Sequence, residues 1–388
     1  MNNILFYCPR YPHFGGIEIV TTHITKWLSV NGYKVWIFSF EHSSDRKLAA
    51  TVPADVNVVF SPVEQIAAQE NVAALKHLIS TENIDIVVMQ DSYAASLAET
   101  LFAALEDFPK VKLAVVEHNA PNHIELLYKY RSRKNIKEKI KKFVLLGKRK
   151  RQNRSRHLML YNRADRYVLL SKQFVHVWER VTGLNDHPKL TYINNPVTCD
   201  EPSDVCLPTK CKESLFVGRL AEQKGIHLLL PIWKRIEQQC PDWTLTIVGD
   251  GELRGWMETY IRENGLKHVA MEGMQSNTAQ YYRRASLLFA TSLFEGWPLT
   301  LSESMINFTP PLLYNTYAAA SDIVTSGENG YLFTPMDEDT FVSTAVRLMR
   351  NAEERNALAC CAHESARRFS IERIGQLWVK LIKSLQEE

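Results

Sequence analysis

A chain of 388 residues is longer than one hydrophobic core usually organises, so two domains of roughly 150 to 200 residues each are expected. Hydrophobic residues make up 45% of the chain and charged residues 23%, which excludes a disordered or fibrous protein. Seven cysteines, an odd number without a Cys-x-x-Cys pair, argue against a disulfide framework or a zinc site and fit a reducing cytoplasm.

The first residues lack the basic and long apolar regions of a signal peptide. No stretch reaches the ~18 uninterrupted apolar residues that a membrane span requires. A cytoplasmic location is therefore expected.

The first half alternates short apolar runs with amphipathic helical segments. A strand at residues 4–7 is followed by a loop with Gly15 and Gly16, then by a helix that closes near Gly32. Further strands are expected at residues 34–38, 57–60, 84–89, 112–116 and 167–170. This pattern is typical of a parallel sheet covered by helices and predicts a doubly wound α/β domain over residues 1–196.

Positive charge is concentrated in residues 129–156, which contain fourteen lysines and arginines and one acid, Glu138. Since the whole chain carries only +3, the remainder is net negative. Ile136, Ile140, Phe143 and Val144 fall at helical spacing, and a basic helix with an apolar stripe can lie on an anionic membrane surface. Each lysine or arginine near such a surface adds about 1 kcal/mol. The cations expected to form this patch are Lys137, Lys141, Lys142, Lys148, Arg149, Lys150 and Arg151.

Two other interpretations of the basic segment are open. A solvated helix that covers the core with its apolar stripe has the same pattern. A nucleic-acid surface is disfavoured, because aromatic residues interleave poorly and no nucleic-acid-binding module is recognisable. If the segment binds lipid, the protein is peripheral on the inner face of the plasma membrane.

The second half repeats the α/β pattern over residues 197–369. Its strands are expected at residues 214–217, 245–248, 268–271, 287–290 and 311–314. Two such domains would face each other across a cleft, and ligands of doubly wound sheets bind beyond the carboxyl ends of the strands. Residues 370–388 form an amphipathic helix that we expect to cross back to the first domain.

Two motifs follow predicted strands of the second half. Arg219 and Lys224 come just after the first strand, where two cations can neutralise a diphosphate, although a pair of surface cations has the same appearance. Gly249 and Gly251 follow the next strand, where glycine leaves the backbone bare for a ligand.

Glu295 and Glu303 lie eight positions apart, the first in a loop and the second on a helix that Pro298 is expected to open. The start of a helix offers unpaired N–H groups and a positive dipole end to a diphosphate. One carboxylate can then bind sugar hydroxyls and the other the ribose. A capped helix with solvated acids is the alternative interpretation.

The residues together resemble the family-4 retaining glycosyltransferases, whose GT-B fold consists of two facing Rossmann-like domains. The resemblance covers most of the chain and is strongest over residues 214–337. Six landmarks occur in the family's order: Gly15-Gly16, His118, the Arg219 and Lys224 motif, Gly249 to Gly251, the Glu-x7-Glu pair, and the Asn-Gly-Tyr-Leu turn at residues 329–332.

The resemblance implies roles for the second domain. Arg219 and Lys224 would hold the donor diphosphate and stabilise its departure. Glu295 would contact hydroxyls of the donor sugar, and Glu303 the ribose. The amides near Leu299 and Thr300 would bind the phosphate or the sugar.

For the first domain the resemblance implies a second set of roles. His118 would sit over the donor sugar, and Gly15 and Gly16 would let the backbone approach the phosphate. Glu18 would face the acceptor. The sequence departs from the family at residues 305–311, which are bulky where the family commonly has small residues and a glycine.

The implied activity is retaining transfer of a hexosyl unit from a UDP or GDP sugar to a glycan or lipid-linked acceptor. Surface polysaccharide assembly, such as that of capsule, O-antigen or exopolysaccharide, is the expected setting. No cofactor and no metal are expected: the acids at residues 337–339 resemble an Asp-x-Asp metal motif but fall at a predicted helix start, where acids suit the dipole.

Two rival functions fit parts of the sequence. An NAD(P)-dependent oxidoreductase would use Gly249, Gly251 and Gly255 as a dinucleotide fingerprint and Glu272 as the ribose acid. A non-catalytic protein would bind a sugar nucleotide without turning it over.

Overall fold

The computed structural model describes residues 3–41, 50–90, 94–130, 136–202 and 207–387, without the side chains of residues 130 and 136–144. Its contacts divide the chain into two units. Unit 1 comprises Met1–Asn122, Gly147–Thr198 and Ser370–Glu388, and unit 2 comprises His123–Leu146 and Cys199–Phe369.

Unit 1 is built on a seven-stranded parallel sheet with the order β3-β2-β1-β4-β5-β6-β7. The order reverses between β1 and β4, the switch point at which doubly wound sheets bind ligands. The strands are β1 (Asn3–Arg10), β2 (Lys34–Glu41), β3 (Val56–Phe60), β4 (Ile86–Met89), β5 (Lys112–Glu117), β6 (Arg166–Leu169) and β7 (Leu190–Tyr192). The sequence did not predict β7, because it has three residues and its side chains are partly or fully exposed.

Helices flank this sheet in the alternating pattern that the sequence predicts. Those assigned wholly to unit 1 are α1 (Gly16–Val30), α3 (Gln69–Thr81), α4 (Ala95–Leu105), α7 (Gln173–Thr182) and α15 (Ile371–Gln386). The long basic helix α6 (Ile136–Arg163) crosses the division, and its part from Gly147 onward belongs to unit 1.

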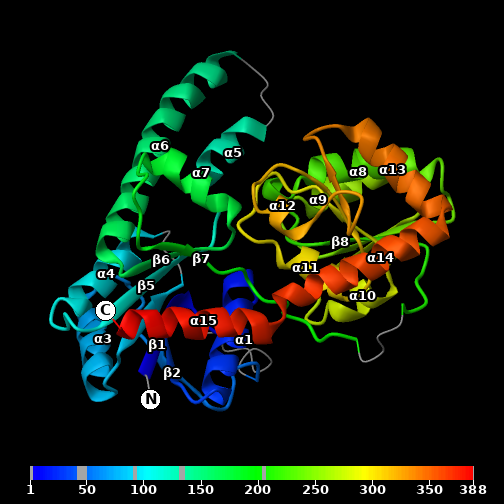
Figure 1. The fold of residues 1–388 in the computed structure, drawn as a ribbon. Coiled ribbons are helices and arrows are strands. Elements are labelled where there is room, and N and C mark those ends of the chain that lie inside the picture. The colour runs from blue at the N-terminus through cyan, green and yellow to red at the C-terminus, as the bar shows by residue number, and fades with distance from the viewer. Residues whose placement is uncertain (1–2, 42–49, 91–93, 131–135, 203–206, 388) are drawn as a thin grey trace. The chain divides into compact units, whose positions relative to one another are not determined.

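The C-terminal helix α15 packs against α1, and the two lie next to each other in Figure 1. A Cβ atom at Gly375 would overlap the indole ring of Trp27 in α1, so glycine is needed for this close approach. The ring of Trp378 lies 6.3 Å from that of Phe6 in β1. The predicted packing of the last helix on the first half is thereby confirmed.

Unit 2 contains a six-stranded parallel sheet with the order β10-β9-β8-β11-β12-β13, which reverses between β8 and β11. Its strands are β8 (Glu213–Val217), β9 (Thr244–Val248), β10 (Val269–Gly273), β11 (Leu287–Ala290), β12 (Pro311–Tyr314) and β13 (Tyr331–Phe333). Its helices are α5 (His123–Tyr130), α8 (Ile226–Glu237), α9 (Arg254–Glu263), α10 (Ala279–Arg284), α11 (Leu299–Ile306), α12 (Ala320–Ile323), α13 (Glu338–Arg350) and α14 (Ala352–Ala366), with short 3-10 turns η1 (Glu222–Lys224) and η2 (Arg367–Phe369).

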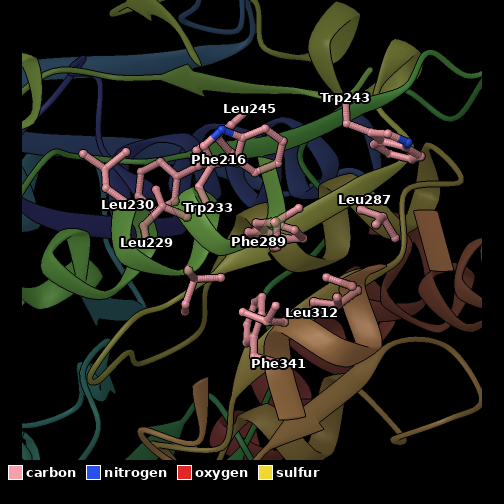
Figure 2. Packing of buried hydrophobic residues seen from close by; sticks show 14 of the residues in the cluster. Phe216, Leu229, Leu230, Trp233, Trp243, Leu245, Leu287, Phe289, Leu312 and Phe341 are labelled. Atoms are coloured by element: carbon pink, nitrogen blue, oxygen red, sulfur yellow. The ribbon is translucent and has the colours of Figure 1, made fainter. Parts of the chain in front are cut away.

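The core of unit 2 lies between its sheet and the covering helices. Figure 2 shows Trp233 of α8, Phe289 of β11 and Phe341 of α13 within this cluster. All three are almost fully buried, and the rings of Phe289 and Phe341 pack edge to face at 5.3 Å. The apolar residues of these strands and helices therefore pack together as one hydrophobic core.

The bulky residues after Glu303 belong to the interior of unit 2. Phe308 has a φ of 58°, a left-handed conformation that favours glycine, and its ring stacks on His363 of α14 at 3.9 Å. Lys210 donates hydrogen bonds to the carbonyls of Tyr282 and Asn307, at 3.0 and 2.6 Å. The departure from the family pattern is thus accommodated by ring stacking and by the hydrogen bonds of a partly buried lysine.

Candidate functional site

Most of the predicted site residues of unit 2 lie around the switch point of its sheet. The segment after β8 carries Arg219 and Lys224, and the segment after β11 carries Glu295. Because β8 and β11 are neighbours in the sheet and run parallel, their carboxyl ends reach the same edge. Residues that are about seventy positions apart in the sequence are therefore brought together.

Lys224 and Glu295 form the central contact of this group. Lys224 Nζ donates to Glu295 Oε1 at 2.7 Å, and the two side chains are 19% and 10% exposed. Gln223 Nε2 donates to the carbonyl of Phe294 at 3.0 Å and also lies 3.5 Å from Glu295 Oε2. A short, partly buried pair of this kind places a cation and a carboxylate with little freedom.

The backbone joins the same two segments. Leu293 N donates to Gln223 O at 2.8 Å, and Thr291 Oγ1 donates to Lys224 O at 2.9 Å. Gly225 has a φ of 64°, and a Cβ atom there would overlap the carbonyl oxygen of Thr291. The glycine after Lys224 is therefore required for the close approach that positions the ion pair.

Arg219 contacts a different carboxylate, that of Glu252. Its side chain is 73% exposed, and Nε lies 3.5 Å from Glu252 Oε2 in the segment after β9. An exposed pair at this distance stabilises the fold little, so the guanidinium is available to an anion.

Gly249 and Gly251 are required by backbone packing, independently of any ligand. A Cβ atom on Gly249 would overlap the carbonyl of Gly218, and one on Gly251 would crowd the backbone of Leu220. Leu220 N also donates to Asp250 O at 2.9 Å. The glycines let the segments after β8 and β9 pack backbone against backbone, and contact with a donor remains a prediction.

The segment of Glu303 differs by one residue from the prediction. Pro298 is the N-cap of α11, with an extended ψ of 105°, and the helix begins at Leu299. The amides of Leu299 and Thr300 are then in the first turn, where N–H groups lack intrahelical acceptors. Glu303 Oε2 accepts a hydrogen bond from Tyr282 OH at 2.9 Å. Burial, assisted by the Glu303 charge, raises the pKa of Tyr282 well above its ordinary value, so the phenol stays a donor.

Unit 1 holds the remaining predicted residues. Gly15 is the N-cap of α1 and Gly16 its first residue. Glu18 is buried in the first turn, and its carboxylate accepts from Arg10 Nε at 3.2 Å. A Cβ atom at Gly15 would overlap that carboxylate. The carboxylate of Glu18 therefore lies at the positive end of the α1 dipole, in the same helix. The acceptor role of Glu18 stays a prediction.

His118 follows β5 and meets Gln90, which follows the neighbouring strand β4. Its Nε2 lies 2.6 Å from Gln90 Oε1. Burial lowers the pKa of His118 to about 4, although the nearby Glu117 carboxylate acts in the opposite direction. His118 is therefore a neutral imidazole at pH 7.

The sequence did not identify Gln223, Tyr282 or Gln90 as parts of these groups. Gln223 directly precedes Lys224, and this position within the motif is the one feature of the sequence that could have pointed to it. Tyr282 and Gln90 contact Glu303 and His118 across sequence separations of 21 and 28, and nothing in the local pattern marks them.

The basic segment is described in part. Lys148, Arg149, Lys150 and Arg151 are exposed on α6, whereas the side chains of Lys137, Lys141 and Lys142 lie outside the described residues. In the portions of the chain that the structure describes, no helix is long and apolar enough to span a membrane.

The acids at residues 337–339 start α13, as predicted. Asp337 is the N-cap and accepts from Thr340 N at 3.1 Å. Among the described residues, no three His, Cys, Asp or Glu side chains are grouped so that they could hold a metal ion.

Comparison with solved structures first defines the class of fold. The fold is that of the GT-B glycosyltransferases: HepE of Anabaena, solved in complex with UDP and glucose, superposes with a TM-score of 0.75 and 18% identity, covering 99% of this chain and 100% of that one. TarM of S. aureus superposes with a TM-score of 0.76 and 12% identity, covering 98% and 99%.

The family follows from the sequence. A model described as Glycosyltransferase Family 4 matches residues 14–201, and one described as Glycosyl transferases group 1 matches residues 201–364. The chain is therefore a family-4-like glycosyltransferase. An uncharacterized glycosyltransferase of Haemophilus influenzae is 23% identical over 386 residues, 97% of this chain and 99% of that protein. The lipopolysaccharide 1,6-galactosyltransferase of Salmonella typhimurium is 31% identical, but the match covers only 35% of this chain and 39% of that protein.

Proposed function

We propose that the protein transfers a hexosyl unit from a nucleotide-diphosphate sugar, with UDP favoured over GDP, to a glycan or lipid-linked acceptor in surface polysaccharide assembly. The observation that carries the proposal is the Lys224–Glu295 pair, 2.7 Å apart at the switch point of the unit 2 sheet. UDP is favoured because a structural neighbour was solved with UDP and glucose. The setting is favoured by the likeness to a lipopolysaccharide galactosyltransferase.

The charges of the candidate site match the charge that develops in such a transfer. The bond between the anomeric carbon and the diphosphate oxygen breaks, and its electron pair leaves with the diphosphate. Lys224 and the exposed Arg219 are the cations assigned to that negative charge. The new bond forms to the acceptor hydroxyl, whose proton goes to the departing diphosphate.

Other groups bind rather than react in this proposal. Glu295 accepts hydrogen bonds from hydroxyls of the donor sugar, and Glu303 from those of the ribose, while Tyr282 keeps the Glu303 carboxylate in place. The imidazole of His118 lies over the sugar in this proposal. It is neutral, because burial lowers the pKa of His118 to about 4. Retention of the anomeric configuration and independence of metal ions are further parts of the proposal.

The test is nucleotide release from a panel of UDP and GDP sugars, with and without a lipid-linked acceptor. We expect release with one donor, an unchanged rate in EDTA, and a product whose anomeric proton coupling matches that of the donor. Full activity of both Glu295→Ala and Lys224→Ala variants would refute the site assignment. Binding of nucleotide without turnover of any donor would favour a non-catalytic binding protein, and quenching of protein fluorescence by NADH but not by UDP would favour an oxidoreductase.

Contact with an anionic membrane surface is the second part of the proposal. It is supported by the exposed cations Lys148, Arg149, Lys150 and Arg151 on α6, and a lipid-linked acceptor would lie at such a surface. Cosedimentation with vesicles of phosphatidylglycerol and phosphatidylcholine tests it. Charge reversal at Lys148, Lys150 and Arg151 is expected to abolish binding at low salt, and unchanged binding would contradict a membrane role for these residues.

A further inference from the structure

Residues 117–122, the segment that carries His118, are held by an ion pair between the buried Glu117 and the partly buried Arg156. Glu117, the last residue of β5, is 1% exposed, and its Oε2 accepts from Arg156 Nη2 of α6 at 2.8 Å. The hydroxyl of Tyr167 in β6 donates to the same oxygen at 3.1 Å. Glu117 Oε1 lies 3.4 Å from the amide of Asn119, the residue after His118.

The other end of the segment is held by the same face of α6. Asn153 Nδ2 donates to the carbonyl of Pro121 at 2.8 Å, and His157 Nε2 lies 3.2 Å from that oxygen. Since a carbonyl only accepts, Nε2 is the donor in this contact. The other nitrogen of His157 lies 2.8 Å from Tyr167 OH. Residues 153, 156 and 157 fall on one helix face, so a single element grips the segment on both sides of His118.

Low exposure to solvent strengthens the ion pair that holds this segment. Arg156 is 16% exposed at its side chain and Glu117 is 1% exposed, so the pair is little screened by water. Removing one partner of a buried ion pair leaves the other charge without compensation. The orientation of the segment therefore depends on Arg156 more than on a surface contact of equal length.

We infer that Arg156, supported by Asn153 and His157, is a positioning residue for His118 and sets the orientation of its imidazole for sugar transfer. The inference deepens the proposed function and rests on it, since it takes His118 to face the donor sugar. It assigns to the C-terminal half of the basic helix a role in turnover that is separate from the exposed cations at residues 148–151.

The experiment compares Arg156→Met with a matched control, Arg154→Met. Arg154 lies on the same helix and donates to the carbonyl of Thr182 at 2.8 Å, away from the His118 segment. We expect Arg156→Met to lower kcat about 100-fold, as misplacement of a group in the site does, with the KM for the donor and the Kd for nucleotide changed less than twofold. Arg154→Met keeps kcat within twofold. Arg156→Lys, which retains the charge, restores most of the rate.

A double-variant cycle separates positioning from general damage. If Arg156 acts through the imidazole, Arg156→Met costs little further rate in a His118→Ala background. Equal losses in Arg156→Met and Arg154→Met, or fully multiplicative losses with His118→Ala, would overturn the inference.

A second readout does not depend on activity. Hydrogen exchange of a peptide covering residues 117–122 is expected to accelerate at least tenfold in Arg156→Met and to remain unchanged in Arg154→Met. Unchanged hydrogen exchange in both variants would refute the inference that α6 holds residues 117–122 in place. If no donor is turned over by the unaltered protein, the proposed function fails, while the exchange result still decides whether Arg156 holds the segment.

Discussion

The two units place their candidate residues at the same edge of similar sheets but treat charge in opposite ways. In unit 2 the cation Lys224 and the carboxylate Glu295 pair directly at the switch point, with part of each side chain in contact with solvent. In unit 1 the residue at the strand end, His118, is neutral, and the preceding residue, the buried Glu117, pairs with the partly buried Arg156 of α6. The difference lies in where the ion pair stands: in unit 2 the candidate residues themselves form it, whereas in unit 1 it stands beside a candidate histidine that desolvation keeps uncharged.

The largest expected effect comes from removing the cation of unit 2. Lys224→Met leaves Glu295 without its ion-pair partner and removes one of the two cations that the proposal assigns to the diphosphate, so kcat should fall by about 10²- to 10³-fold. Nucleotide release measures it. Lys212→Met is the control, because Lys212 forms an exposed ion pair with Asp242 at 2.5 Å. The kcat of this variant should be unchanged. Activity of Lys224→Met within threefold of the parent would remove the contrast between the units.

Lys210, a partly buried cation of unit 2, gives the next largest effect, which is on stability. Burial lowers the pKa of Lys210 to about 7, and its ammonium satisfies the carbonyls of Tyr282 and Asn307. Lys210→Met removes these donors and should lower the free energy of unfolding by about 2 to 4 kcal/mol in urea titrations. Lys234→Met, which loses one hydrogen bond to Asn264, should cost about 1 kcal/mol or less. Equal losses would mean that the hydrogen bonds of Lys210 stabilise the fold no more than that of Lys234 does.

Glycine substitutions compare the packing of a helix from each unit. Gly375→Ala in α15 forces a methyl group against Trp27 and should cost about 1 to 3 kcal/mol of unfolding free energy. Gly255→Ala in α9 of unit 2 meets nothing within 4 Å and should be neutral or stabilising by up to about 1 kcal/mol. Thermal unfolding of both variants provides the measurement. A Gly375→Ala protein as stable as its parent would contradict the close packing of α15 on α1.

The smallest effect concerns pH. Since the pKa of His118 lies at about 4, the imidazole stays neutral between pH 7.5 and 5.5, and kcat should show no inflection near pH 6.5 that a His118→Asn variant lacks. For stability, the unfolded chain binds the proton first as the pH falls below 6.5, so the free energy of unfolding decreases toward acid. A pH profile of kcat for the two proteins tests the first point. An inflection near 6.5 that disappears with His118 would show a solvated, ionisable histidine instead of a buried neutral one.

Much of the fold could be predicted because its strands are short apolar runs bounded by turns. Residues 4–7 lie in β1 and residues 311–314 coincide with β12, and both runs are buried and paired with a strand on each side. The short, partly exposed β7 has no such run and was missed. Pro298 was placed one residue too far into its helix, since its ring constrains φ but not the extended ψ of 105° that the chain adopts there.

For the candidate site, the sequence by itself determined which residue types stand at which strand ends, because motif spacing is a local property. Lys224, Glu295 and His118 could all be singled out in this way. Only the tertiary structure decided which of them meet and in what electrical state. The order of the strands brings Lys224 to Glu295 and Gln90 to His118, and folding removes the water that would otherwise keep His118 near its ordinary pKa. Pairing and desolvation depend on neighbours distant in the chain, which no local pattern encodes.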